Sequence, residues 1–316
     1  MVQSSIGLIE RAAALLRQRE ADPAADAAGA PGMPPPAPPA AQPAAPPVAE
    51  PDRLAGHEPS SADITLNRVR LAAYGITVPS TERSRTIEEF RLVKRNLMSA
   101  WSSGDPLADA PQNRVIMVTS ARPGEGKTFT AINLALAFAS EKDVKALLVD
   151  IDTQHPLLPS ILGIPMQKGI VDVLTGDCEL SEVLLRTDIP NLSILPAGPG
   201  GPQVPELFSS NRMIALMDEI TRRLPDHFII LDTPPCLASS DAAALLPLVG
   251  QIVFIVEAHR TQQEEIETAL GVLSGGPRIS LLLNKADTMA SEHFGSYGYY
   301  YYPGRKSDAL RSETPT

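Results

Sequence analysis

The chain has 316 residues, of which 43% are hydrophobic, and its formal net charge is −10. This length and composition allow a sizeable core, while the acidic balance argues against nucleic acid as a partner. Two cysteines, Cys178 and Cys236, are too few for a disulfide framework or a cysteine-rich zinc site. The longest apolar run, residues 242–256, is interrupted by Pro247 and Gly250, so we expect a soluble, cytoplasmic protein without a spanning segment.

The first 83 residues are expected to lie outside the main domain. Residues 6–19 place apolar side chains at helical spacing, which predicts an amphipathic helix within residues 1–20. Residues 21–83 are dominated at first by alanine and proline, and we expect a mostly disordered linker there because such a stretch buries little apolar surface. Three interpretations of the helix remain open: a docking helix for a protein, a membrane-surface helix, or a frayed tail.

From residue 84 to about residue 288, helical and strand-like segments alternate. The expected helices are residues 86–101, 127–140, 205–224 and 261–273, and the expected strands are residues 114–120, 145–151, 192–198, 227–233, 251–258 and 279–284. Nearly continuous valine, isoleucine and leucine in the strands indicates burial on both faces. This pattern predicts an α/β fold with a mostly parallel sheet and helices on both faces.

A phosphate-binding loop follows the first of these strands. Residues 123–128 read Pro-Gly-Glu-Gly-Lys-Thr and open the helix at Lys127. Glycines let backbone amides surround phosphate oxygens, and the start of the helix adds partial positive charge there. Lys127 would reach the β- and γ-phosphates, and the Thr128 hydroxyl would bind Mg²⁺. The first glycine of the general pattern is replaced by Ala121.

Three aspartates are expected at the same edge of the sheet. Asp150 and Asp152 end the second strand of the loop-containing unit, and Asp232 ends a later strand. The carboxyl ends of parallel strands form the crevice in which open α/β sheets bind ligands. Three acids beside a triphosphate imply a metal ion, because without one their negative charges would repel the triphosphate.

In combination, these motifs resemble the bacterial tyrosine kinases (BY-kinases) that control polysaccharide export, proteins with a P-loop NTPase-like fold. The resemblance rests on the phosphate loop, the segment LLVDID, the segment FIILDTPP and a tyrosine-rich end, and it covers about residues 84 to 305. It implies ATP and Mg²⁺ as cofactors and a protein-tyrosine autokinase activity. The N-terminal helix and proline-rich linker resemble the exosortase-associated members.

The resemblance also implies roles for individual residues. Lys127, Asp150, Asp152 and Asp232 would be catalytic, and Thr128 with the three aspartates would hold the metal. The nucleotide would be bound by Pro123, Gly124, Glu125, Gly126, Lys127, Thr128, Phe129 and Asn284. The acceptors would be Tyr297, Tyr299, Tyr300, Tyr301 and Tyr302, which lie in an expected flexible tail over residues 289–316.

The same resemblance implies the partners. Residues 88–97 resemble the helix through which family members contact a neighbour, which implies a homo-oligomeric ring. A separate membrane protein that regulates chain length would recruit the kinase to the inner face of the membrane, and a tyrosine phosphatase would reverse the reaction.

Three alternatives remain open on the sequence. A partition-type ATPase would carry a signature lysine where Arg122 stands, and the segment NKAD at residues 284–287 mimics the guanine-reading motif of GTPases. A non-catalytic nucleotide switch is the third, because Gln154 replaces an arginine that is usual in the family.

Overall fold

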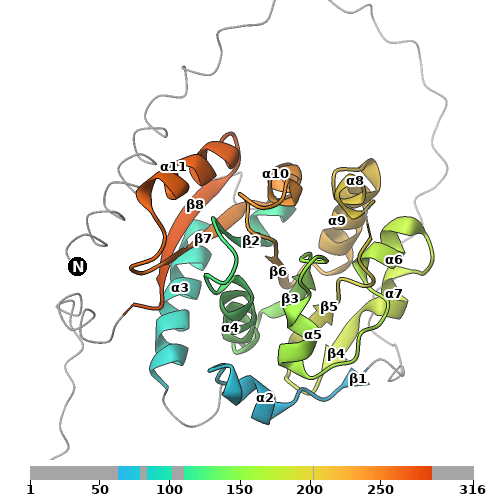
Figure 1. The fold of residues 1–316 in the computed structure, drawn as a ribbon. Helices are drawn as coiled ribbons and strands as arrows, with labels where there is room; N and C mark the ends of the chain where they lie inside the picture. The colour runs from blue at the N-terminus through green and yellow to red at the C-terminus, as the bar shows by residue number, and fades with distance from the viewer. Residues whose placement is uncertain (1–62, 79–83, 102–109, 202, 287–316) are drawn as a thin grey trace, which may run out of the picture.

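The computed structural model describes residues 63–78, 84–101, 110–201 and 203–286. Their strands form one sheet in the order β1-β4-β5-β3-β6-β2-β7-β8, in which every neighbouring pair is parallel except β4 with β5. The strands are β1 (Asp63–Ile64), β2 (Val115–Ser120), β3 (Lys145–Asp150), β4 (Leu185–Thr187), β5 (Leu192–Leu195), β6 (His227–Asp232), β7 (Gln251–Glu257) and β8 (Arg278–Asn284). Figure 1 shows helices on both sides of this sheet.

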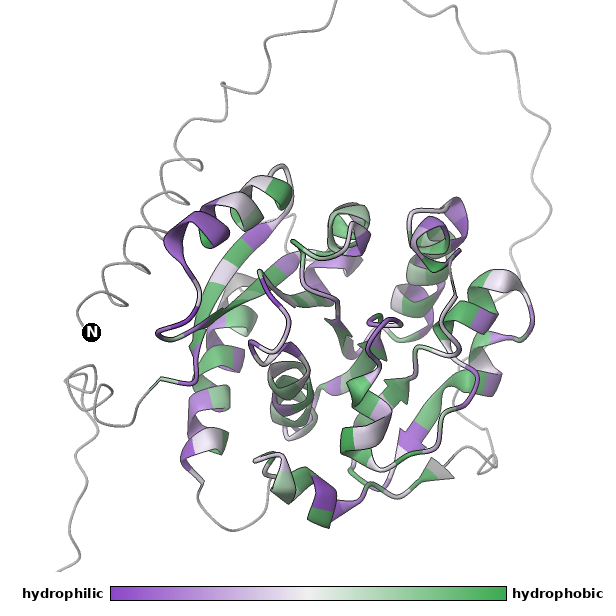
Figure 2. Ribbon diagram, viewed as in Figure 1, coloured by the Kyte–Doolittle hydropathy of each residue, from purple (hydrophilic) through white to green (hydrophobic). Residues whose placement is uncertain are grey.

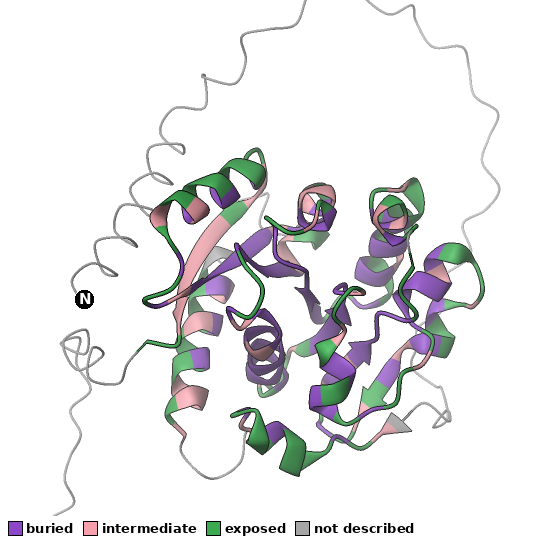
Figure 3. Cartoon of the chain, in the orientation of Figure 1, coloured by how far each residue is buried: buried purple, intermediate pink, exposed green. Residues whose placement is uncertain are grey.

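The sheet separates two hydrophobic cores because successive side chains of a strand point to opposite faces. In β2, Val115 and Met117 belong to one core, whereas Ile116 and Val118 belong to the other. Figure 2 shows the hydrophobic central strands, and Figure 3 shows that they are buried whereas the edge strand β8 is only partly so.

Different helices cover the two faces. The first core is covered by α6 (Ile170–Thr175), α7 (Leu180–Val183), α8 (Val204–Phe208), α9 (Asn211–Arg223), α10 (Asp241–Ala244) and α11 (Gln263–Val272). The second is covered by α2 (Arg68–Ala73), α3 (Arg85–Trp101), α4 (Lys127–Ala139) and α5 (Leu157–Leu162). Short 3₁₀ turns occur at Pro111–Arg114 and Leu246–Leu248. The expected α/β fold with a mostly parallel sheet is therefore confirmed.

Short elements between the expected ones, such as α5, α6 and β4, were not predicted, and two further differences have a clear physical reason. The helix expected over residues 205–224 is two helices, because Ser210 caps the start of α9 by accepting a hydrogen bond from the Met213 amide. Part of the expected linker also belongs to the fold: β1 pairs with β4, and Leu66, Leu71 and Ile76 are buried. These apolar side chains gain enough burial to hold the segment against the second core.

The expected N-terminal helix, most of the linker and the tyrosine-rich end lie outside the described residues. Within the part of the chain that the structure describes, no helix combines the length and apolar character required to cross a bilayer.

Candidate functional site

The phosphate loop connects β2 to α4 at the carboxyl end of the sheet. Gly124 and Gly126 have φ angles of 82° and 102°, a region in which other residues are strained. The side chains of Lys127 and Thr128 lie in the first turn of α4 and are largely buried. The local sequence therefore produces the strand–loop–helix geometry that a phosphate group requires.

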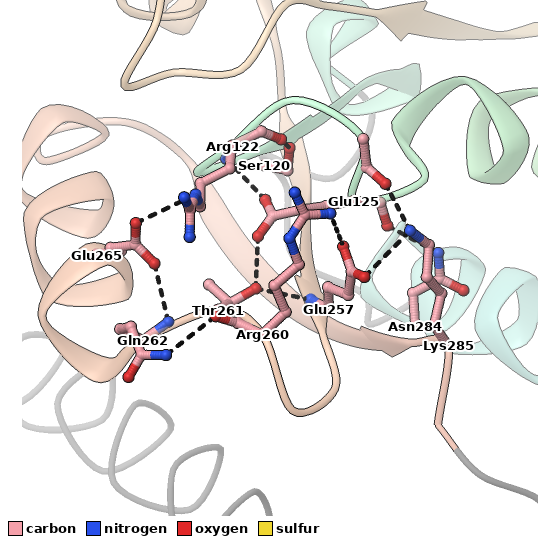
Figure 4. Close-up of polar contacts among 11 residues, drawn as sticks. Ser120, Arg122, Glu125, Glu257, Arg260, Thr261, Gln262, Glu265, Asn284 and Lys285 are labelled. Carbon is pink, nitrogen blue, oxygen red and sulfur yellow. Dashed lines mark hydrogen bonds and ion pairs between the residues drawn. The ribbon is translucent and has the colours of Figure 1, made fainter.

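Two side chains at the end of β8 donate hydrogen bonds to carbonyl groups of this loop. The side-chain amide of Asn284 donates to the Glu125 carbonyl at 2.8 Å, and the Lys285 ammonium donates to the Gly124 carbonyl at 2.7 Å (Figure 4). A Cβ atom on Gly126 would lie 2.1 Å from Asn284 Nδ2, so any side chain at that position would force the Asn284 side chain to move.

The Glu125 side chain points into the protein and stabilises the loop by hydrogen bonds. It is fully buried, and its carboxylate accepts hydrogen bonds from the Arg122 amide at 2.8 Å and from the Thr261 hydroxyl. Thr261 in turn accepts from the Glu257 amide at the end of β7, at 2.9 Å. Of Glu125, only the backbone is therefore left to contact a nucleotide.

Arg122 occupies the position at which a partition-type ATPase would carry its signature lysine. Its guanidinium pairs with Glu265 of α11 at 3.3 Å, within the same chain (Figure 4). This pairing ties the loop to α11.

The three aspartates meet behind the loop, as their strand positions predict. Asp150 and Asp232 are direct partners in the register of β3 and β6, and all three side chains are buried. The Asp152 amide donates to the Asp150 carboxylate at 3.1 Å, and the His155 amide donates to the Asp152 carboxylate at 3.1 Å. Gln154 and His155 themselves are exposed.

Burial and mutual repulsion shift the titration of this group. The pKa of Asp150 is raised well above its ordinary value, mainly by burial and then by Asp232 and Asp152. Burial raises the pKa of Asp232 to about 7, although a hydrogen bond with Thr128 and the charge of Lys127 oppose the rise. A cation placed here would stabilise both carboxylates in their charged form.

The donor set fits Mg²⁺ bound together with a nucleotide. Asp150 Oδ2 and Asp232 Oδ1 are buried and have no hydrogen-bond partner. No group of three acidic, histidine or cysteine side chains within residues 63–286, where described, forms a ready-made metal cage. Mg²⁺ commonly takes only one or two protein carboxylates and completes its shell with phosphate oxygens and water. Thr128, Asp150 and Asp232 match that partial shell, with Asp152 adjacent to it.

Two further groups of expected site residues have different outcomes. Phe129 packs against Phe90 at a ring distance of 6.0 Å and belongs to the second core, so its side chain has a structural role. The five tyrosines lie outside the described residues. Lys285 and Thr261 were missed by the sequence reasoning. The segment NKAD was a signal for Lys285, whereas nothing local marks Thr261.

Comparison with known proteins gives consistent matches over this region. Residues 113–263 match the family model described as an AAA domain. The tyrosine-protein kinase YwqD of Bacillus subtilis (strain 168) is 30% identical over 234 residues, which are 74% of this chain and 93% of that protein. The tyrosine-protein kinase CpsD of Streptococcus agalactiae is 28% identical over 228 residues, which are 71% of this chain and 94% of that protein.

Solved structures agree with these relatives. The kinase domain of VpsO is 30% identical with a TM-score of 0.52, covering 65% of this chain and all 100% of that one. The chimerical protein CapA2B2 is 26% identical with a TM-score of 0.56, covering 70% of this chain and 93% of that one. The matched region of the AAA domain model contains the phosphate loop and all three aspartates.

Proposed function

Since the chain belongs to the bacterial tyrosine-protein kinases, with their P-loop NTPase-like fold, we propose that it transfers the γ-phosphate of Mg·ATP to tyrosines of neighbouring copies. The proposed acceptors are Tyr297, Tyr299, Tyr300, Tyr301 and Tyr302. The observation that carries this proposal is the pair of unpartnered, buried carboxylate oxygens of Asp150 and Asp232 beside the phosphate loop. Through this reaction the protein would regulate the chain length and export of a polysaccharide.

Each site residue has a defined task in this proposal. Lys127 neutralises the β- and γ-phosphates, and the backbone of residues 123–126 surrounds them. Thr128, Asp150 and Asp232 would hold Mg²⁺, with Asp152 supporting them. The ion supplies neutralisation of the charge that develops on the transferred group.

Asp150 is the proposed proton acceptor. The tyrosine oxygen bonds to the γ-phosphorus as the bond from that phosphorus to the bridging oxygen of ADP breaks, and the phenol proton passes to the carboxylate. A bound cation would counter the rise in the pKa of Asp150; with an ordinary aspartate pKa of about 4 against about 10 for a phenol, full transfer before attack would cost about 8 kcal/mol. The proton therefore moves late, as the new bond forms.

Asn284 is the proposed contact for the base, and the resemblance to the kinases favours ATP over GTP as the donor. One hydrogen of its side-chain amide is committed to the Glu125 carbonyl, which fixes the orientation of the group. Its Oδ1 atom remains as an acceptor for the exocyclic amine of adenine, and its second amide hydrogen remains as a donor. Competition between the two nucleotides for binding tests this assignment.

The partners belong to the same proposal. Exposed side chains of α3, among them Arg91, Leu92 and Arg95, offer a surface for a neighbouring copy in a ring. A separate membrane protein that regulates chain length would recruit the kinase to the inner face of the membrane, and a tyrosine phosphatase would reset it. The expected helix within residues 1–20 is one candidate for docking to that protein, with the linker as its tether, and residues 289–316 are the proposed acceptor tail.

Intact-mass analysis after incubation with Mg·ATP tests the central reaction. We expect mass increases in multiples of one phosphate for the native chain, and none for Lys127→Met. Replacing all five tail tyrosines with phenylalanine should remove the increase while leaving nucleotide binding unchanged. Unaltered mass in a native chain that still binds Mg·ATP would instead identify a non-catalytic nucleotide switch.

A further inference from the structure

Lys285 stands at an unusual point of the chain. It follows β8 directly and has a φ angle of 55°, one of three positive values among the described residues other than glycine. Such strained positions concentrate where the surrounding structure imposes a function. Its ammonium group donates to the Gly124 carbonyl at 2.7 Å and pairs with the Glu257 carboxylate at 3.2 Å.

These contacts fix the direction of the loop's backbone amides. In a trans peptide the carbonyl and the following N–H point in opposite directions. Lys285 holds the Gly124 carbonyl toward β8, and Asn284 does the same for the Glu125 carbonyl (Figure 4). The amides of Glu125 and Gly126 therefore point away from β8, so two successive N–H groups share one side of the loop, as an anion requires.

Gly124 would not select this orientation by itself. Glycine populates positive and negative φ about equally, so the peptide between Gly124 and Glu125 can rotate at low cost. Glu257 is largely buried and orients the lysine, and it also pairs with Arg260 at 3.1 Å. Lys285 thus connects the Glu257 carboxylate to a loop peptide that glycine leaves free to rotate.

We propose that Lys285 is a positioning residue of the kinase reaction, which presets the phosphate loop with its amides toward the nucleotide before the nucleotide binds. The inference rests on the proposed function. It explains the lysine of the segment NKAD by a role in ATP binding, where the segment alone would suggest a guanine-reading motif.

Arg260 provides a matched control for Lys285. Both are cations paired with Glu257, and their side chains are 50% and 46% exposed. Of these two cations, Lys285 donates to the Gly124 carbonyl. The Arg260 guanidinium lies beside the loop, with Nη1 3.7 Å from the position of a Cβ atom on Gly124, and donates to Glu257. Lys285→Met and Arg260→Met therefore remove the same charge from the same carboxylate beside the same loop, and they differ in the hydrogen bond to the loop carbonyl. Lys285→Arg keeps the charge and a donor.

The experiment measures Mg·ATP and Mg·ADP affinity by calorimetry on the full chain, and the urea midpoint without nucleotide. We expect Lys285→Met to lower the affinity for both nucleotides about tenfold, because one charge-assisted hydrogen bond typically contributes that much to binding. Arg260→Met should change affinity less than about twofold, since an exposed ion pair contributes little. Lys285→Arg should recover part of the loss in affinity, and Lys285→Met should lower the urea midpoint slightly more than Arg260→Met, because it also loses the hydrogen bond to the Gly124 carbonyl.

The results separate the inference from the proposed function. Equal nucleotide affinity in Lys285→Met and Arg260→Met overturns the inference, as does an affinity loss in Lys285→Met that Lys285→Arg does not reduce. A native chain that binds neither nucleotide overturns the inference and the proposed function together.

Discussion

Replacing Gly126 with alanine perturbs the phosphate loop at its most crowded point. The φ angle of 102° costs a residue with a Cβ atom about 1–2 kcal/mol. The new Cβ would also lie 2.1 Å from Asn284 Nδ2, which must move and lose its hydrogen bond to the Glu125 carbonyl. That bond is worth about 1 kcal/mol. We therefore expect Gly126→Ala to lower the free energy of unfolding by about 2–3 kcal/mol.

Urea denaturation without nucleotide measures this loss, and Gly275 supplies the control. Gly275 has a φ angle of 76°, but a Cβ there meets no atom within 4 Å. Gly275→Ala should therefore show only the backbone cost, about 1–2 kcal/mol. Adding Asn284→Ala to Gly126→Ala should destabilise less than the sum of the single changes, because the colliding group is gone. Equal losses in the two glycine variants, or strict additivity, would refute the reasoning.

Three further predictions follow from burial. The pKa of Asp232 is about 7 in the folded protein and about 4 in the unfolded chain. The free energy of unfolding of the metal-free protein should therefore fall as pH rises between these values. Urea titrations should show a smaller fall for Asp232→Asn. Phe138 is fully buried and stacks on Phe228 at 4.4 Å, so Phe138→Ala should cost about 3–5 kcal/mol by the same method, and a loss below about 1 kcal/mol would contradict the packing. Burial raises the pKa of Cys236 to about 12, so in a Cys178→Ser chain a thiol reagent should modify it only in urea, and rapid labelling of that chain in its native state would show that the site opens.

The sequence predicted the parts of the fold that depend on local pattern. The central strands are apolar on both faces, and their ends carry Asp150 and Asp232, so sequence alone placed both acids at one edge. Their pairing in register follows from the parallel order of β3 and β6.

Features that depend on distant contacts were not predictable in this way. The segment after the alanine- and proline-rich stretch has few apolar residues, and their spacing predicts no core element. Nevertheless, the structure buries Leu66, Leu71 and Ile76 against residues far along the chain. The buried carboxylate of Glu125 bonds to Thr261, 136 positions away. No periodicity encodes such a pairing, because it exists only once β2 and β7 lie side by side.

The contact between Lys285 and Gly124 also bears on the kinetics of self-phosphorylation. It places the root of the tyrosine-bearing segment at the donor loop of its own molecule. The 12 residues from Lys285 to Tyr297 can extend about 40 Å. A segment of that length could reach the site of its own molecule as well as the site of a neighbouring copy, so length alone does not decide between cis and trans transfer. Mixing two variants does: phosphate on Lys127→Met incubated with a chain that carries phenylalanine at all five tail tyrosines marks transfer between copies, and its absence marks transfer within one molecule.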